Sequence, residues 1–572
     1  MEAAGSKQRF AFPQSYTPKH LAERILASKP ALEGERKQVT VLFSDVKGSM
    51  ELIAERDPED ARSILDPVLE QMMEAVHRYE GTVSQVMGDG IMALFGAPLA
   101  HEDHAVRACY AALAMQAAIR KYSEELLRAH GVTVQIRVGL NSGEVVVRTI
   151  SNDLHMDYSA VGQTTHLAAR MEQLATPGSV LLTPETLRLA EGFVHVTPLG
   201  PLPVKGLPEA VEVFELTGAS AARTRMQAMA ARGLTRFVGR QTELEVLGQA
   251  LQRAGAENGQ FVALVGEPGV GKSRLVWEFT HSHRTAGWLV LESGSVSYGK
   301  ATAYRPIIDL LKIYFQIEDR DDPRKIREKT IGKLLTLGRD LEATLPAFLA
   351  LLDVPVQDAA WEALDPPQRR QKILNHLNRL VLRESQVQPL VLVFEDLHWV
   401  DAETQSFLDS LVESLPTARI LLLVNYRPEY HGRWASKPYY TQLRIDPLPT
   451  ETTQELLDTL LGADPKLLPL RRLLIERTEG NPFFVEESVR ALVETHALVG
   501  DRGAYRLAKN LATLAMPTSV QPVLAARIDR LPPYEKRLLQ IAAVIGKDVA
   551  FALLCAIADL PEDALRRSLA NL

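Results

Sequence analysis

Two stretches of the chain, VTVLFSDVKGS (residues 39–49) and VSQVMGDGIMALFG (residues 83–96), each place an aspartate beside an apolar run. The first alternates apolar residues and predicts a strand that ends at Asp45. The second predicts two short strands joined by a tight hairpin with Asp89 at its tip. Either aspartate alone could be a turn former, but Mg²⁺ takes one or two protein carboxylates and completes its shell with water and phosphate oxygens. The pair therefore predicts a metal site that carries phosphates, formed by Asp45, Asp89 and the adjoining Val46.

The segment from Val39 to Leu216 resembles the catalytic domain of class III adenylate and guanylate cyclases. In that family one aspartate closes the first strand, a second lies in a Gly-Asp-Gly hairpin, and both bind the two metal ions. The resemblance continues through VQIRVGLNSGEVV, DYSAVGQTTHLAARME and LGPLPVKGLPEAVEVFEL. It implies a ferredoxin-like α/β sheet and two Mg²⁺ or Mn²⁺ ions in each cyclase site.

A helical stretch, GQTTHLAARMEQL, places His166 and Arg170 four residues apart and so on one face. The cyclase family has a transition-state asparagine and arginine at these positions, on a face that meets the metal site of a partner subunit. Arg170 matches the family residue, whereas His166 replaces the asparagine. The resemblance therefore implies a homodimer with shared sites, and an ordinary surface arginine and interface histidine are the alternative.

Base selection departs from the family pattern. Gln85 stands where adenylate cyclases have a lysine, and Ser159 where they have an aspartate or threonine. Lysine only donates hydrogen bonds, whereas glutamine donates and accepts, so Gln85 could read adenine or guanine.

Three further residues are candidates for contacts to the phosphates. Lys205 resembles the family lysine that contacts the polyphosphate, with a solvated loop lysine as the alternative. Gly48 and Ser49 follow Asp45 and could offer backbone N–H groups to phosphate oxygens.

A second α/β pattern contains FVALVGEPGVGKSRLVWEF (residues 261–279), an apolar strand followed by a glycine-rich loop and a helix. That order is the context of a phosphate-binding loop. Its backbone N–H groups face the phosphates, a lysine reaches the β and γ oxygens, and a serine ligates Mg²⁺. The predicted nucleotide-binding residues are Gly266, Glu267, Pro268, Gly269, Val270, Gly271, Lys272 and Ser273.

Two later strand patterns supply the rest of an ATPase site. PLVLVFEDLHWVD ends in the Walker B acids Glu395 and Asp396, and ARILLLVNYRPEY ends near Arg427 in a sensor-like position. Together with FVGRQTEL and GNPFFVEE, which contains Pro482, they resemble the STAND class of AAA-like signal-transduction ATPases. In that class a Gly-x-Pro element packs on the nucleotide.

Length and composition predict several soluble domains. The 572 residues are 46% hydrophobic and 24% charged, with a net charge of -7 and only two cysteines. No signal core, membrane span or long basic run is evident, so we expect a cytoplasmic protein that binds neither membrane nor nucleic acid. The expected parts are a lead-in over 1–37, the cyclase domain over 38–217, a helical linker over 218–235, the P-loop ATPase domain over 236–430, a helical domain with the GNP motif over 431–515, and an incomplete winged-helix-like region over 516–572.

The cyclase domain and the ATPase together resemble the soluble adenylate cyclases and related bacterial multidomain cyclases. The resemblance implies an adenylate cyclase that converts ATP to cyclic AMP and pyrophosphate, with the ATPase as a regulatory switch. The ATPase site would hold ATP with Mg²⁺. Regulatory protein partners are compatible with this organisation, and the sequence does not identify them. The alternative is a weak or inactive cyclase-like domain that binds nucleotide and dimerises within an ATPase-driven signalling or transcription regulator.

Overall fold

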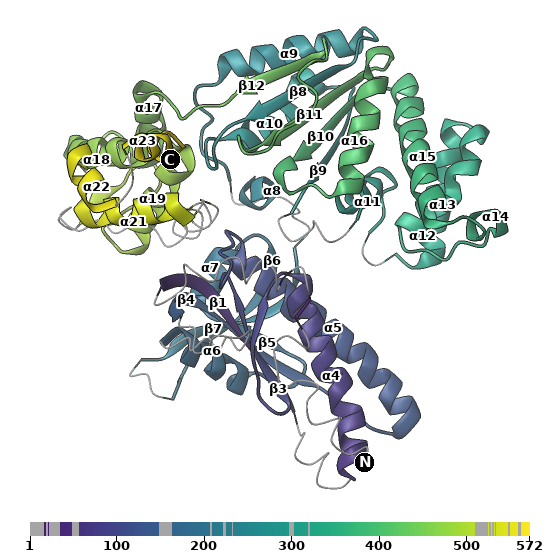
Figure 1. The fold of residues 1–572 in the computed structure, drawn as a ribbon, viewed down its shortest axis with the longest axis horizontal. Coiled ribbons are helices and arrows are strands. Elements are labelled where there is room, and N and C mark those ends of the chain that lie inside the picture. The colour runs from purple at the N-terminus through teal and green to yellow at the C-terminus, as the bar shows by residue number, and fades with distance from the viewer. Residues whose placement is uncertain are drawn as a thin grey trace. The chain divides into compact units, whose positions relative to one another are not determined.

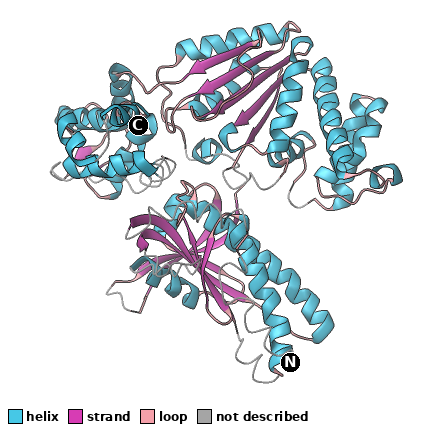
Figure 2. Ribbon diagram, in the orientation of Figure 1, coloured by secondary structure: helices cyan, strands magenta, loops and turns pink. Residues whose placement is uncertain are grey.

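The computed structural model describes residues 17–18, 21, 35–47, 57–147, 163–205, 209–220, 225–230, 233–296, 303–318, 321–508, 524, 528, 531, 533–546, 549–558 and 562–571. The chain divides into compact units with a boundary between residues 222 and 223. Each unit contains its own sheet flanked by helices (Figures 1 and 2). The cyclase-like and ATPase-like parts are therefore described one at a time.

The cyclase-like part is built on a seven-stranded sheet with the strand order β2-β3-β1-β4-β5-β7-β6. The central strands β1 and β4 are antiparallel, and β1 also pairs with β3. Helices α4 and α5 run side by side on one face (Figure 1). Helix α6 packs on the opposite face. The elements are β1 (Glu35–Val46), α4 (Pro58–Arg78), β2 (Thr82–Val86), β3 (Gly90–Phe95), α5 (His104–His130), β4 (Ile136–Val147), α6 (Gln163–Leu174), β5 (Val180–Leu182), α7 (Pro184–Ala190), β6 (Val194–Leu202) and β7 (Val211–Ala219).

Helix α4 shows how core packing outweighs a local signal. Asp57 caps the helix by accepting a hydrogen bond from the amide of Glu59. The helix then continues through Pro67 to Arg78, although an internal proline costs about 3 kcal/mol. The stripe of Ile64, Leu65, Val68, Met72 and Val76 is buried against the sheet. Because burying each such side chain stabilises by about 1.5–3 kcal/mol, the stripe outweighs the proline.

The ATPase-like part has a five-stranded parallel sheet with the order β12-β8-β11-β10-β9. Helices α9 and α10 cover one face, whereas α11 and α16 lie on the other and share a hydrophobic core with α12 to α15. The elements are α8 (Arg225–Ala230), α9 (Gln241–Gly255), β8 (Gln260–Val265), α10 (Lys272–Thr280), β9 (Leu289–Gly294), α11 (Arg305–Tyr314), α12 (Pro323–Leu337), α13 (Leu345–Leu351), α14 (Ala359–Glu362), α15 (Pro366–Val387), β10 (Leu390–Glu395), α16 (Ala402–Ser414), β11 (Ile420–Tyr426) and β12 (Tyr440–Arg444). Strand β12 extends the sheet beyond residue 430, where we expected the domain to end.

A helical subdomain follows the ATPase sheet and has its own buried leucine core. It contains α17 (Thr450–Leu461), α18 (Leu468–Thr478), α19 (Pro482–Glu494) and a short hairpin of β13 (Leu498–Val499) and β14 (Arg506–Leu507). The last described elements are α21 (Pro533–Ile545), α22 (Phe551–Ala558) and α23 (Glu562–Asn571). The described residues beyond 515 contain helices only, so the winged-helix expectation stays a prediction.

Candidate functional site

The two aspartates lie together at the end of the β1–β3 pair. Asp45 is the last but one residue of β1 and lies opposite Gly90 in the register. Asp89 occupies the hairpin between β2 and β3, where the Met87 amide donates to the Gly90 carbonyl at 2.8 Å. The Val46 amide donates to the Asp89 carbonyl at 3.3 Å, which ties the hairpin to the end of β1. The predicted metal positions Asp45, Val46 and Asp89 therefore converge.

Both glycines around Asp89 have a steric reason to be glycine. Gly88 has φ of 71°, in the left-handed region that glycine enters without strain. A Cβ on Gly90 would lie 2.5 Å from the Ser44 carbonyl oxygen. The hairpin thus turns at Gly88 without backbone strain, and it approaches β1 closely because Gly90 lacks a side chain.

An arginine that we did not predict completes this side of the site. Arg137 Nη2 lies 2.9 Å from Asp45 Oδ2 and 2.8 Å from Glu172 Oε1. Burial raises the pKa of the Asp45 carboxyl, the hydrogen bond from Arg137 lowers it, and the nearby Asp89 raises it. Burial likewise raises the pKa of Glu172, and Arg137 opposes that shift. We call Asp45, Asp89 and Arg137 the metal half-site.

The other predicted cyclase residues lie on separate elements. His166 is exposed and Arg170 is half-buried on α6, where Arg170 donates to Gln173. Gln85 is exposed on β2, next to an irregularity in its pairing with β3. Lys205 is exposed in the turn after β6. Gly48, Ser49 and Ser159 lie outside the described residues, so their predicted roles stay predictions.

The P-loop residues 266–273 connect β8 to α10, as the sequence predicts. Lys272 Nζ donates to the carbonyls of Gly266 at 2.7 Å and Glu267 at 2.9 Å. Burial is the main cause that lowers the pKa of Lys272 to about 8, and Arg427 adds to it. Gly269 and Gly271 have φ of 83° and 100°, which the loop needs to turn its N–H groups inward.

The Walker B acids meet this loop at the carboxyl edge of the sheet. Burial, followed by the charge of Asp396, raises the pKa of Glu395 to about 8, and a hydrogen bond with Ser273 opposes that rise. The Asp396 amide donates to Asn425 Oδ1 at 2.8 Å. Arg427 is 5% exposed and lies over the Trp399 ring at 5.1 Å. Ser273, Glu395, Asp396 and Arg427 thus gather around Lys272, and Asn425 is a supporting residue that we did not predict.

The helical subdomain reaches the P-loop through the GNP motif. Asn481 Nδ2 donates to the Pro268 carbonyl at 2.9 Å, and the Phe483 amide donates to the Gly269 carbonyl at 3.3 Å. Asn481 also caps α19, whose first residue is Pro482. Pro482 therefore lies beside the loop, as expected of a Gly-x-Pro element, and Asn481 makes the contact.

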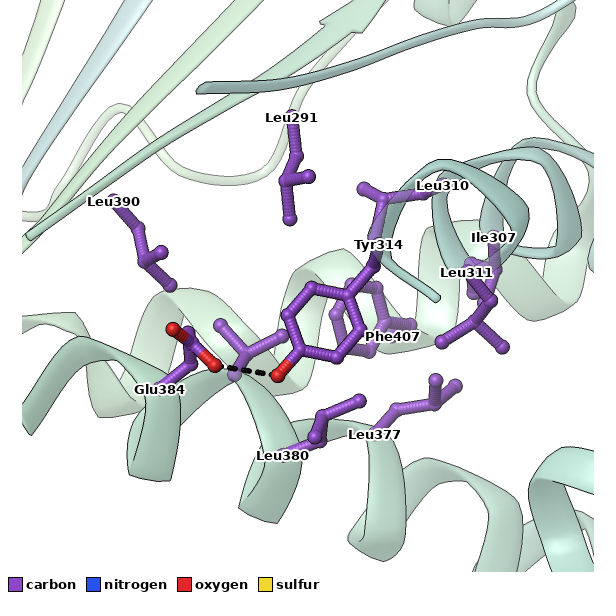
Figure 3. Close-up of a pocket in the computed structure, with 11 residues that line it drawn as sticks. Leu291, Ile307, Leu310, Leu311, Tyr314, Leu377, Leu380, Glu384, Leu390 and Phe407 are labelled. Carbon is purple, nitrogen blue, oxygen red and sulfur yellow. Dashed lines mark hydrogen bonds between the residues drawn. The ribbon is translucent and has the colours of Figure 1, made fainter. Parts of the chain in front are cut away.

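A buried cavity elsewhere in the ATPase-like part carries no site. Its volume is about 20 Å³, and leucines, Ile307 and Phe407 dominate its lining (Figure 3). The one acid at its wall, Glu384, accepts hydrogen bonds from Tyr314 and Gln388. A space of that size accommodates at most one water molecule. The cavity is a packing defect and not a ligand site.

The candidate metal ligands in this chain are the acids of the metal half-site. Among the residues that the structure describes, no group of three or more histidines, cysteines and acids is placed to hold a metal ion. The metal half-site instead offers two neighbouring carboxylates, which are hard oxygen donors suited to Mg²⁺ or Mn²⁺ when phosphate and water complete the shell. The residues present fit such an ion.

The two parts of the chain each match the model of a known domain family. Residues 33–218 match the family model of the adenylate and guanylate cyclase catalytic domain, and residues 236–424 match that of the AAA ATPase domain. The chain therefore contains a class III adenylate/guanylate cyclase domain followed by an AAA ATPase domain. In the described part of the chain, no helix combines the length and apolarity needed to cross a membrane.

Among relatives, an uncharacterized protein of Rhizobium meliloti (strain 1021) is 26% identical over 97% of this chain and 53% of its own length. Adenylate cyclase 1 of the same organism is 28% identical over 36% of this chain and 31% of its own. The chain thus spans about half, or less, of these curated relatives. The crystal structure of the adenylyl cyclase CyaB from P. aeruginosa is 31% identical and matches 33% of this chain and 98% of its own, with a TM-score of 0.32. That of the guanylyl cyclase Cya2 is 30% identical over 33% of this chain and 96% of its own, with a TM-score of 0.32.

Proposed function

We propose that this protein is an adenylate cyclase that converts ATP to 3′,5′-cyclic AMP and pyrophosphate at sites shared between two identical chains. The observation that carries the proposal is the metal half-site, in which two carboxylates and a guanidinium converge at the end of β1. Such an arrangement suits a metal–triphosphate substrate because the carboxylates hold the cations and the guanidinium can pair with phosphate oxygens.

Asp45 and Asp89, with the Val46 carbonyl, would hold two Mg²⁺ or Mn²⁺ ions. When bound, such ions supply Lewis-acid chemistry that favours loss of the ribose 3′-hydroxyl proton and offsets the triphosphate charge. In the reaction the 3′-oxygen bonds to the α-phosphorus and the bond from that phosphorus to the pyrophosphate oxygen breaks. Arg137, which pairs with Asp45 at 2.9 Å, would add positive charge beside the bound phosphates.

His166 and Arg170 are proposed to act on the metal half-site of the partner chain. Arg170 would stabilise the charge that develops on the phosphorus and the leaving oxygen. A neutral His166 would donate one hydrogen bond to the ribose and orient it. The exposure of His166 on α6 supports a role that is completed by a second chain.

Gln85 and Ser159 are proposed to read the base, and Lys205, with the backbone of Gly48 and Ser49, to bind phosphates. Gln85 is exposed on β2, close in sequence to the Asp89 hairpin. Because its amide both donates and accepts, we propose ATP as the preferred substrate with modest selectivity over GTP.

The ATPase domain is proposed to bind ATP or ADP with Mg²⁺ and to act as a slow switch on the cyclase. Lys272, Ser273, Glu395, Asp396 and Arg427 would contact or position the nucleotide. The contact of Asn481 with the P-loop supports the switch, since it links the nucleotide loop to the helical subdomain.

A second candidate function is a cyclase-like domain that binds nucleotide and dimerises without turnover. The departures from the family at Gln85 and His166 favour it, because they fall in the base-reading and transition-state positions. In that case the ATPase would be the working part of a regulator.

One assay separates the two functions. The purified chain is incubated with Mn²⁺-ATP and, separately, Mn²⁺-GTP, and the products are quantified by mass spectrometry. Cyclic AMP that disappears in Asp45→Ala supports the adenylate cyclase. The matched control is Asp66→Ala, an acid on α4 outside the proposed site. Nucleotide binding without any cyclic product, at every protein concentration, would instead support the non-enzymatic candidate.

A further inference from the structure

One face of strand β4 forms a track along which helix α6 lies. Arg137, Gly139, Asn141 and Gly143 occur at every second position, so all four belong to the same face of the strand. Each of them meets α6, at its start, its middle or its end. We call these four residues the α6 track.

Of the two glycines of the track, Gly139 brings the backbone of β4 against the backbone of α6, and Gly143 brings it against the Thr164 side chain. A Cβ on Gly139 would lie 2.0 Å from the Glu172 amide nitrogen and 2.4 Å from the Ala168 carbonyl oxygen. A Cβ on Gly143 would lie 2.7 Å from Thr164 Oγ1. At Gly139 there is no room for a side chain, so the distance of α6 from the sheet is fixed there, whereas a side chain at Gly143 would have to displace that of Thr164.

The two polar residues of the track fix the helix along its own axis. Asn141 is 3% exposed, and its Nδ2 donates to the Thr164 carbonyl at 2.9 Å. Its Oδ1 accepts from Thr183 Oγ1 at 2.7 Å, which sets the orientation of the amide. At the other end, Arg137 Nη2 holds Glu172 at 2.8 Å. The start and the end of α6 are therefore both tied to β4.

The proposed transition-state residues lie on the opposite side of the same helix. Thr164, Ala168 and Glu172 are four residues apart and form the face on the track. His166 and Arg170 are each two residues further along, and hence about 200° around the helix. Any slide or rotation of α6 on its track would move both of them.

We infer that Asn141 and Glu172 are positioning residues that set the place of His166 and Arg170 relative to the sheet. This inference rests on the proposed cyclase function. Asn141 holds α6 and also accepts a hydrogen bond from Thr183. Glu172, by contrast, holds Arg137, which contacts Asp45 in the metal half-site. A displacement of about 1 Å at a reacting group can cost up to a hundredfold in rate.

The first test separates turnover from binding in Asn141→Ala. The kcat for Mn²⁺-ATP falls about tenfold or more, while KM changes less than about threefold, because α6 acts in the transition state and the metal half-site binds the substrate. The matched control is Gln116→Met, which removes a buried amide that α5 donates to the carbonyls of Ile136 and Ser179, away from α6. A rise in KM with kcat unchanged in Asn141→Ala would overturn the inference. So would a fall of kcat in Gln116→Met as large as that in Asn141→Ala.

The second test assigns the effect to one half of the shared site. Chains with Asp89→Ala and chains with Arg170→Ala are co-expressed with two tags, so that each heterodimer has one intact site. Asn141→Ala added to the Asp89→Ala chain, which supplies the working α6, lowers activity about tenfold. Added to the Arg170→Ala chain, it leaves activity within about twofold. The reverse pattern, or equal losses, contradicts a role in positioning α6.

A third measurement does not depend on turnover. Hydrogen exchange of the α6 amides in the full chain becomes faster in Asn141→Ala, while exchange in α5 is unchanged. Unchanged exchange in α6 overturns the inference even if the wild-type chain makes no cyclic nucleotide. A chain without cyclase activity but with faster α6 exchange overturns the proposed function alone.

Discussion

The cyclase and ATPase domains both gather charged residues into a candidate site, but they distribute them differently. In the ATPase domain the P-loop, the Walker B acids and Arg427 come together at one edge of one parallel sheet. In the cyclase domain the metal half-site lies at the end of β1, and His166 and Arg170 lie on the side of α6 that is turned from its track. The ATPase site is assembled within one chain, whereas the proposed cyclase site needs residues from two chains.

This difference determines where each activity can be controlled. A site assembled within one chain responds to local changes such as the contact between Asn481 and the P-loop. A site divided between chains responds to anything that alters dimer geometry or population. The proposed switch would therefore act on the cyclase through the pairing of chains.

The largest expected effect comes from breaking the single-chain site. Lys272→Ala removes the cation of the P-loop, and we expect ATP hydrolysis by the ATPase domain to fall about a thousandfold, as when a key charge-stabilising donor is lost. Mixing these chains with Glu395→Gln chains should give no recovery, because Lys272 and Glu395 act within one chain. The measurement is phosphate release with the cyclase site disabled by Asp45→Ala. Recovery of ATP hydrolysis on mixing would show that the ATPase site, too, is shared between chains.

The next largest effect is expected from low pH, which should lower the stability of the cyclase domain through His104. His104 is buried in the cyclase core, next to Thr40, and burial lowers its pKa to about 4. The unfolded chain takes up a proton near pH 6.5, so the stability from neutral His104 is present above pH 6.5. It is lost as pH falls from 6.5 through 4, by about 3 kcal/mol in total.

His104→Asn can keep the hydrogen bond to Thr40 without a titrating ring, and should flatten this dependence. The measurement is the midpoint of the cyclase-domain unfolding transition between pH 4 and 7, with His281→Asn in the ATPase domain as the control. An unchanged pH dependence in His104→Asn would rule out the assignment.

A smaller effect is expected on the choice between adenine and guanine nucleotides. Gln85→Lys replaces an amide that donates and accepts by a group that only donates, which matches adenine N1 and opposes the guanine N1–H. We expect the ratio of kcat/KM for ATP over GTP to rise about tenfold, the scale of one well-placed hydrogen bond. Gln163→Lys, on the first turn of α6, is the matched control. An unchanged ratio would remove Gln85 from the base-reading role.

The smallest expected effect is on the link between the P-loop and the helical subdomain. Asn481→Ala removes the hydrogen bond to the Pro268 carbonyl and the cap of α19. We expect the dissociation rate of a fluorescent ADP to rise about threefold to tenfold, since one hydrogen bond contributes about 1 kcal/mol. Asn481→Asp keeps an acceptor for the cap and loses the donor, so it separates the two contacts. Equal rates of ADP release from the wild type, Asn481→Ala and Asn481→Asp would show that the contact of Asn481 with the P-loop does not affect nucleotide binding.

Local patterns predicted the sites better than the supports around them. Asp45 and Asp89 follow from strand alternation and from a glycine-flanked hairpin, which are short-range signals. The pairing of Arg137 with Glu172 joins residues far apart in sequence and depends on how α6 packs across β4. Only the period-two spacing of the α6 track could have pointed to it. The contact of Asn481 with Pro268 was hidden for the same reason.

Some element boundaries were not predictable because their signals are weak. Strand β12 is a sheet edge with a half-exposed burial pattern, so it lacks the apolar run of the central strands. An internal proline such as Pro67 favours a kink or break, but α4 continues through it because the buried stripe of that helix prevails. Both differences arise from tertiary packing.

The central claim, that the cyclase site is divided between two chains, is tested most directly by mixing inactive variants. Asp89→Ala and Arg170→Ala chains, each inactive alone, are co-expressed with different tags and purified as heterodimers, and cyclic AMP formation from Mn²⁺-ATP is measured. Each heterodimer has one intact site, so the account predicts about half the wild-type activity per dimer. No activity from purified heterodimers, with the wild-type dimer active under the same conditions, would contradict it.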